Sequence, residues 1–200
     1  MIELKENDLL FAKVNPNAII PTKEKENAGY DIYACFDEDY LVIPSHSTKL
    51  VPTGIASAIS DKYYLGVAER GSTGKIGMKY SAGVIDSGYR GQIFVAITNT
   101  NNVDIIISKL TREELEEEYG KVGYDNSIVM DNTDNDSLVW LEDYDDCDSM
   151  TCIIYPYEKA IAQLIVHEVY NEIVPKEVSY DELKSIPSKR GTGSLGSSGK

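Results

Sequence analysis

Short apolar runs, each followed within a few residues by a turn signal, most constrain how this 200-residue chain can fold. The turn signals include Pro16-Asn17, Pro21-Thr22 and Asp86-Ser87-Gly88, residue types that favour tight turns. No long segment outside the acidic stretch described below has the 3.6-residue apolar spacing of an amphipathic helix. Many short strands at this spacing are typical of an antiparallel sandwich or barrel, so the sequence predicts an all-β subunit. The predicted strands span 9–14, 31–35, 41–43, 54–59, 63–69, 92–98 and 160–166.

The negative charge of the chain is concentrated in one internal segment. The formal net charge is −14; residues 104–152 hold 15 acidic and three basic side chains, a net of −12, which leaves −2 for the rest. We therefore predict a β domain formed by residues 1–103 and 153–189, an acidic insertion at 104–152, and a Gly/Ser-rich C-terminal arm at 190–200. An acidic run is typical of a solvated surface loop or of a surface that docks a partner, and both interpretations stay open.

A short helix is predicted near the start of the insertion. Thr111 and Glu114 have the spacing of a capping box, and Leu110 and Leu115 flank them as a possible hydrophobic staple. The helix is expected at 112–119, followed by weak strands near 128–130 and 138–141.

Composition also limits the partners and the setting. An acidic chain lacks the basic face that electrostatic binding to nucleic acid requires. No apolar run approaches the roughly 18 residues needed to span a bilayer, and the first residues do not resemble a signal peptide. Three cysteines (Cys35, Cys147 and Cys152) are an odd count that favours a reducing cytosol over a disulfide framework. We expect a cytoplasmic protein without nucleic-acid or membrane partners.

Five segments are unusual for strands or turns that are merely structural. In chain order they are Ala28-Gly-Tyr-Asp-Ile-Tyr-Ala34, Glu69-Arg-Gly-Ser-Thr-Gly74, Gly83-Val-Ile-Asp-Ser-Gly-Tyr-Arg-Gly91, Ala160-Ile-Ala-Gln-Leu-Ile165 and Arg190-Gly-Thr-Gly-Ser-Leu-Gly-Ser-Ser-Gly199. In this order they resemble the five motifs of the homotrimeric dUTPase family, in its phage and bacterial forms. The resemblance implies a jelly-roll-like β subunit in a trimer whose active sites are each assembled from three chains. It also implies Mg²⁺-dependent hydrolysis of dUTP to dUMP and diphosphate, in a bacterial or phage-infected cell.

The third segment carries the residue that the resemblance makes catalytic. Asp86 would orient and deprotonate the attacking water, which a carboxylate within hydrogen-bond reach can do. By the same resemblance, backbone groups from Gly83 to Ile85 would recognise uracil, and Tyr89 would fill the space of a ribose 2′-hydroxyl. From the residues alone, Asp86 also fits an ordinary hairpin turn and Tyr89 an ordinary strand aromatic.

The second and fourth segments supply donors for phosphate oxygens. Arg70, Gly71 and Ser72 offer a guanidinium, a close-approach backbone and a hydroxyl, and the fork of arginine matches phosphate geometry. The usual pattern has serine directly after arginine and often proline before it, whereas this chain has Gly71 and Glu69 there. Gln163 would contact the phosphate chain or the catalytic water, or simply face solvent.

The flank of the fourth segment departs from the family as well. The resemblance calls for glycine-aspartate-arginine just before the strand, but Glu158-Lys159-Ala160 stands there.

The fifth and first segments complete the expected site. The resemblance makes residues 190–200 a mobile arm that closes over the substrate, with Arg190, Gly193, Ser197 and Ser198 near the phosphates. Leu195 stands where the family has an aromatic that stacks on uracil, so it can cap the base only by apolar contact. Asp31 would lie near the water shell of Mg²⁺ or make a structural hydrogen bond, while the phosphates would hold most of the metal.

Two alternatives remain beside dUTP hydrolysis. dCTP deaminase shares the resemblance, but its catalytic glutamate would fall at Ala96, where no carboxylate is available. The second is a regulatory role in which the 104–152 insertion, with Trp140 and several tyrosines, docks a protein partner.

Overall fold

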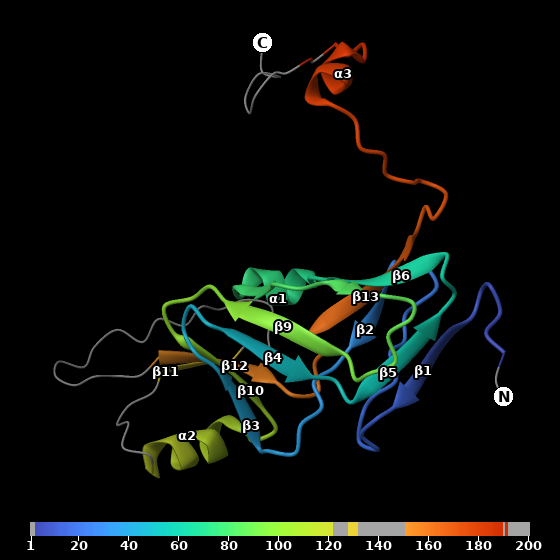
Figure 1. Ribbon diagram of the computed structural model, residues 1–200. Coiled ribbons are helices and arrows are strands. Elements are labelled where there is room, and N and C mark those ends of the chain that lie inside the picture. Colours follow the sequence, from blue (N-terminus) through green and yellow to red (C-terminus); the bar gives the residue numbers. More distant parts are fainter. Residues whose placement is uncertain (1–2, 122–127, 132–150, 190, 192–200) are drawn as a thin grey trace. The chain divides into compact units, whose positions relative to one another are not determined.

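The computed structural model describes residues 3–121, 128–131, 151–189 and 191. Within these residues the chain forms four small β-sheets and three short helices (Figure 1). The first sheet pairs β1 (Leu9–Lys13) with β5 (Ile55–Ile59), and the second has the order β4 (Thr48–Pro52), β9 (Phe94–Asn99), β7 (Met78–Tyr80). The third is β2 (Gly29–Ile32), β13 (Ala162–Glu168), β6 (Tyr63–Ala68), β8 (Val84–Ile85), and the fourth is β11 (Ile128–Asp131), β12 (Thr151–Pro156), β10 (Asp104–Ser108), β3 (Tyr40–Ile43). The predicted all-β class is confirmed.

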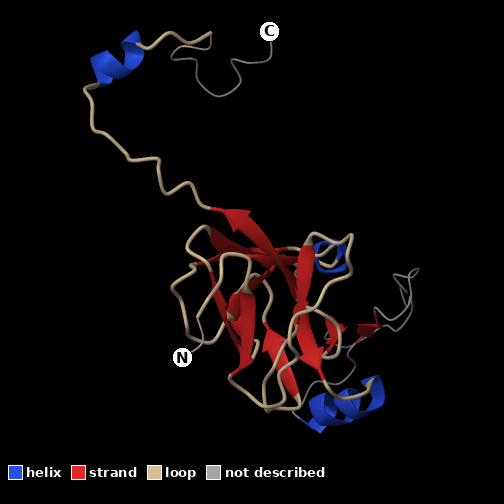
Figure 2. Cartoon of the chain, turned by 90° about the vertical axis from the view of Figure 1, so that its right-hand side faces the viewer, coloured by secondary structure: helices blue, strands red, loops and turns tan. Residues whose placement is uncertain are grey.

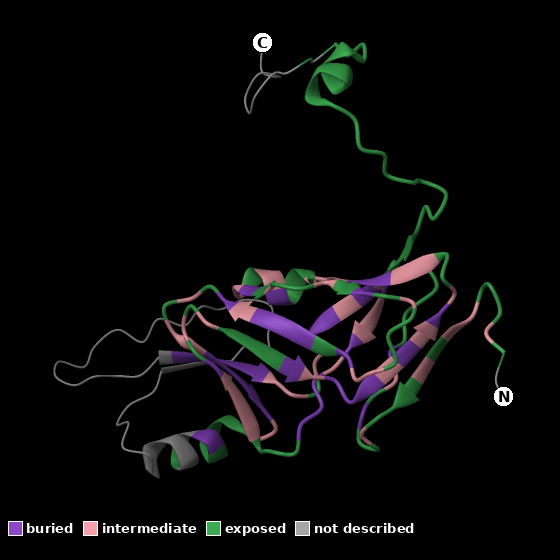
Figure 3. Ribbon diagram, in the orientation of Figure 1, coloured by how far each residue is buried: buried purple, intermediate pink, exposed green. Residues whose placement is uncertain are grey.

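The core follows from alternation along the strands. In β5, Ile55, Ser57 and Ile59 are buried, while the two alanines between them are partly exposed, as expected for a strand with one face on the core. The inward faces of the strands form one large apolar cluster, visible as the buried segments of the arrows in Figure 3.

Strand β10 departs from that alternation because both of its faces are covered. Ile105 and Ile107 lie in the main core, whereas Ile106 faces a second cluster with Leu115 and Cys152. Leu115 belongs to α2 (Arg112–Lys121), which packs on the outer face of this sheet (Figure 2).

Helix α2 begins as the sequence predicts. The backbone N–H of Glu114 donates to Thr111 Oγ1 at 3.3 Å, and the N–H of Thr111 donates to Glu114 Oε2 at 2.9 Å, so the capping box is formed. Leu110 and Leu115 both contact the second cluster. The predicted strand near 128–130 is β11, and the one at 138–141 lies outside the described residues.

Two predicted boundaries of the β domain differ from the structure. Residues 104–108, assigned to the insertion by their position in the acidic stretch, form β10 and pair with β3. The domain predicted to reach residue 189 ends as a compact unit at Val169. Residues 170–200 form a second unit, which contains α3 (Tyr180–Ser185), a helix capped by Ser179. The rest of the insertion stays a prediction.

The sequence predicts antiparallel sheets, but one sheet of the structure also contains parallel pairs. β12 runs parallel to both β10 and β11, because the chain between β10 and β12 passes through α2 before it returns in the same direction. None of the helices in the described residues is long and apolar enough to cross a membrane.

Candidate active site

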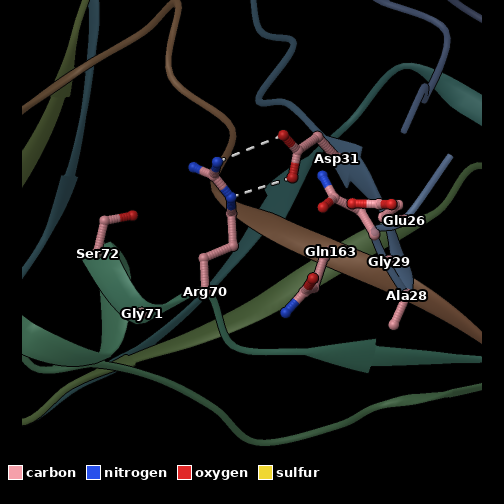
Figure 4. A pocket seen from close by; sticks show the side chains of 9 residues that line it. Glu26, Ala28, Gly29, Asp31, Arg70, Gly71, Ser72 and Gln163 are labelled. Atoms are coloured by element: carbon pink, nitrogen blue, oxygen red, sulfur yellow. Dashed lines mark hydrogen bonds and ion pairs between the residues drawn. The ribbon is translucent and has the colours of Figure 1, made fainter. Parts of the chain in front are cut away.

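A polar cavity of about 440 Å³ opens where three segments of the chain meet (Figure 4). The segments are the turn that leads into β2, the start of α1 (Gly71–Lys75), and β13. The cavity is lined by Glu26, Asn27, Ala28, Gly29, Asp31, Arg70, Gly71, Ser72 and Gln163. Five of these nine residues were predicted as site residues from the sequence; the other four, Glu26 to Gly29, were not.

The pairing of β2 with β13 brings Asp31 and Gln163 together. The two residues are directly opposite in the ladder, so their side chains leave the sheet on the same face. The Gln163 amide donates to the carbonyl of Glu69 at 2.7 Å. A Cβ at Gly29 would collide with the Gln163 side chain, so glycine is required there for Gln163 to face the cavity rather than solvent.

Arg70 is fixed from two sides. Its Nε lies 3.0 Å from Asp31 Oδ1, and its Nη2 donates to Asp31 Oδ2 at 3.3 Å, while Nη1 donates to the carbonyl of Ala160 at 3.1 Å. About a third of each side chain in the pair is exposed, 31% for Arg70 and 35% for Asp31. The guanidinium is therefore oriented before any ligand arrives, with one edge open to the cavity.

The residues after Arg70 form α1, a single short helix of five residues. Thr73 is fully buried, donates to the carbonyl of Arg70 at 3.0 Å, and accepts from the Arg70 N–H at 3.2 Å. This local pairing holds the first turn together and leaves Ser72 exposed beside the cavity. Apart from the residues next to Gly71 and the backbone of its own helix, no atom of the described residues lies within 4 Å of where a Cβ on Gly71 would stand, so the backbone there is open to an approaching ligand.

Two tyrosines that sequence reasoning missed lie behind the cavity. Tyr155 is 1% exposed and donates to the carbonyl of Ala160 at 2.7 Å. The Tyr80 hydroxyl donates to the carbonyl of Ile161 and pairs with Thr73 Oγ1. Burial raises the pKa of Tyr155 and raises that of Tyr80 to about 12. Both hydroxyls stay protonated at neutral pH, so both can act as donors.

Asp86 lies in the segment between β8 and β9, which we call the Asp86 loop and which is built separately from the cavity. The hairpin that the residues alone also fit is not formed, because β8 pairs with β6 whereas β9 pairs with β4 and β7 in another sheet. Asp86 is exposed, and its carbonyl accepts from the N–H of Tyr89 at 3.0 Å, which closes the turn. The Tyr89 hydroxyl donates to the carbonyl of Gln92 at 2.9 Å, and a Cβ at Gly91 would collide with the Tyr89 ring. Among the described residues that line the cavity, none belongs to 83–91.

The predicted uracil-binding segment is tied to the sheet on one side. The carbonyl of Gly83 accepts from the N–H of Val67 at 2.8 Å, and Ile85 is buried against β6. Val84, between them, is 70% exposed. The predicted arm residues Arg190, Gly193, Leu195, Ser197 and Ser198 lie outside the described residues.

Comparisons with known proteins decide the family. A family model for dUTPase matches residues 15–112. The deoxyuridine 5'-triphosphate nucleotidohydrolase of Leptospira interrogans is 36% identical over 103 residues, which cover 50% of this chain and 70% of that relative. The chain belongs to the dUTPase family. A probable dUTPase of Schizosaccharomyces pombe is 39% identical over 97 residues, covering 48% of this chain and 67% of the relative.

Solved dUTPase structures match the fold over nearly the whole chain. The dUTPase of Staphylococcus bacteriophage 80alpha with dUpNHpp has a TM-score of 0.64 and 23% identity, and the match covers 97% of this chain and 99% of that one. A mutant dUTPase from phage phi11 of S. aureus, described with a structural Mg(II) ion, has a TM-score of 0.58 and 18% identity, covering 88% and 99%. These matches confirm the predicted dUTPase jelly-roll fold.

Proposed function

We propose that this chain hydrolyses dUTP to dUMP and diphosphate, with a water molecule attacking the α-phosphorus. The observation that carries the proposal is the cavity in which Arg70, Ser72 and Gln163 converge, in a member of the dUTPase family. An oriented guanidinium, an exposed hydroxyl and an amide are the donors that a polyphosphate requires. Because the Arg70 side chain is already held by Asp31 and Ala160, it binds phosphate without first having to reorient.

Asp86 is the proposed base. Its exposed carboxylate stands in a turn closed by its own backbone, which leaves the side chain available to hold a water molecule. Since the Asp86 loop does not line the cavity of its own chain, we propose that the site is completed between the chains of a homotrimer. The exposed Val84 and Tyr89, at 70% and 46%, are suited to meet the base and sugar of a nucleotide whose phosphates lie in a neighbouring chain. The arm at 190–200 would close the site.

Magnesium fits this site as a companion of the substrate. The described residues contain no group of three or more His, Cys, Asp or Glu side chains that could hold a metal. Both Asp31 oxygens contact Arg70, which leaves that carboxylate able to reach a metal through water rather than to cage it. When bound with the triphosphate, Mg²⁺ would neutralise part of its charge. Arg70 and Asp31 would orient the phosphate chain around it.

Two further proposals are kept. The first is that the acidic insertion at 104–152 docks a protein partner; α2 supports this by burying Leu115 while Glu113, Glu114 and Glu117 stay exposed. A reducing, cytoplasmic setting remains a proposal from the odd cysteine count. dCTP deamination is not favoured, because Ala96 is buried and supplies no carboxylate.

A nucleotide panel tests the proposed function. The full chain with Mg²⁺ would be incubated with dUTP, dCTP, dTTP and UTP, and diphosphate and ammonia would be measured. We expect diphosphate from dUTP in large excess over the other three and no ammonia from dCTP. Equal turnover of dTTP or UTP, or release of ammonia, would contradict the proposal.

A further inference from the structure

The back wall of the cavity is held by two tyrosine hydroxyls on consecutive backbone carbonyls. Tyr155, at the end of β12, donates to the carbonyl of Ala160 at 2.7 Å, and Tyr80, in β7, donates to that of Ile161. These carbonyls stand just before β13, which carries Gln163 into the cavity. The two tyrosines therefore hold the start of β13 against the strands behind it.

The carbonyl of Ala160 is shared between Tyr155 and Arg70. A carbonyl oxygen has two lone pairs and can accept from both, at 2.7 Å from the Tyr155 hydroxyl and at 3.1 Å from Arg70 Nη1. Together with the two Asp31 oxygens, this carbonyl contacts all three nitrogens of the guanidinium. A shift of the Ala160 carbonyl would thus remove one of the three oxygens that orient Arg70.

The hydroxyl of Tyr155 has no solvent to replace this partner. The residue is 1% exposed, and burial raises the pKa of its hydroxyl, while the charge of Arg70 acts in the opposite direction. Tyr155 therefore remains a neutral donor at physiological pH, and it stands next to Arg70 because both donate to the Ala160 carbonyl. No side chain is available from Ala160 itself, where the family pattern has arginine.

We propose that Tyr155 is a positioning residue for phosphate binding, which acts by fixing the Ala160 carbonyl that orients the Arg70 guanidinium. The identity of the ligand as a deoxynucleoside triphosphate rests on the function proposed above. The effect of Tyr155 on Arg70 does not rest on that function, since any diphosphate group in the cavity would depend on the same geometry.

The test measures binding of inorganic diphosphate with Mg²⁺ by calorimetry, apart from turnover. Tyr155→Phe keeps the buried ring and removes only the hydroxyl, so we expect the affinity for diphosphate to fall about fivefold, the effect of one lost hydrogen bond. Tyr157→Phe is the matched control, because Tyr157 packs edge-on against Phe36 and does not line the cavity. It should bind as the wild type does. Equal losses in the two variants would overturn the proposal.

A double-mutant cycle separates positioning from a general loss of stability. If Tyr155 acts through Arg70, the Tyr155→Phe change should cost little further affinity once Arg70→Ala is present, because coupled residues are not additive. Full additivity would contradict the proposal. Weaker diphosphate binding in Tyr155→Phe alongside a wild type that leaves dUTP intact would refute the proposed function but not the positioning role.

A second variant covers the case in which Tyr155→Phe does not fold. Placing 3-fluorotyrosine at position 155 keeps both the ring and the hydroxyl but lowers the hydroxyl pKa. Because the ionised hydroxyl cannot donate to Ala160, diphosphate binding should be lost at a lower pH than in the wild type. An unchanged pH profile would overturn the proposal.

Discussion

The cavity around Arg70 and the Asp86 loop are organised in opposite ways. In the cavity, groups from distant parts of the sequence hold the side chains in place: the Asp31 carboxylate and the Ala160 carbonyl fix Arg70, and the Glu69 carbonyl fixes Gln163. In the Asp86 loop, Asp86 and Tyr89 are exposed, and their bonds stay within the turn. The phosphate half of the proposed site is thus preorganised within one chain, and we propose that the base half is used by a neighbouring chain.

The largest expected effect separates chemistry from binding. Asp86→Asn should lower the turnover of dUTP by at least about a hundredfold, because the amide cannot accept the proton of the attacking water. The same variant should bind diphosphate with wild-type affinity, since the Asp86 loop does not line the cavity. Steady-state kinetics and calorimetry check the two halves of this prediction. Wild-type turnover would remove Asp86 from the mechanism.

The next largest effect is expected on diphosphate binding, which the Asp86 variant leaves unchanged. Arg70→Ala removes charge-assisted hydrogen bonds to phosphate and should weaken diphosphate binding by about 10- to 100-fold. Lys79→Gln is the control, because Lys79 is an exposed cation paired with Glu69 at 3.0 Å, and such surface pairs contribute under about 1 kcal/mol. Equal losses in both variants would mean that general charge, rather than the orientation of Arg70, binds the phosphates.

The stability of the folded chain should depend on pH through Tyr80, which lies behind the cavity. The folded pKa of Tyr80 is raised by burial from 10.0 to about 12. The unfolded chain releases this proton first, so the stabilisation is complete below pH 10 and is lost as the pH rises through the folded pKa. We expect the free energy of unfolding, measured with urea, to fall between about pH 9 and 12, a window set by that shift. This fall should be smaller in Tyr80→Phe. Identical slopes in both proteins would contradict this account.

The smallest effect on activity is expected from α2. Leu115 is 2% exposed in a cluster separate from the main core, so Leu115→Ala should destabilise this packing by about 2–4 kcal/mol. Neither diphosphate binding nor turnover should change, because α2 contributes nothing to the cavity lining. Hydrogen exchange at α2 and dUTP turnover measure the two outcomes. A loss of turnover would tie the insertion to the site.

What the sequence predicted correctly depends on local patterns. Alternation in β5 and the capping box at Thr111 are readable because the relevant residues are neighbours in sequence. β10 was misassigned because division by charge cannot detect that Ile105, Ile106 and Ile107 are covered on both faces. β4 was missed because three of its five residues are exposed and two of these are polar.

The sequence predicts part of the site, again where the local pattern is informative. Arg70, Ser72 and Gln163 stand out as unusual residues in strands and turns, and the structure brings them together. Asp31 as the partner of Arg70, and Tyr155 behind Ala160, depend on the pairing of strands far apart in sequence. Nothing in the local sequence indicates either contact. Tyr155 in particular does not stand out, because tyrosine is common in this chain.

The central claim is that the cavity of one subunit works with the Asp86 loop of another, and mixing two inactive variants tests it most directly. Differently tagged Asp86→Asn and Arg70→Ala chains would be co-expressed, and trimers bearing both tags would be purified and assayed with dUTP. If each site takes its Asp86 loop from one chain and its cavity from another, every trimer that bears both tags has about a third of its sites restored, as expected for a cyclic heterologous interface. Activity no higher than that of either variant alone would contradict the claim.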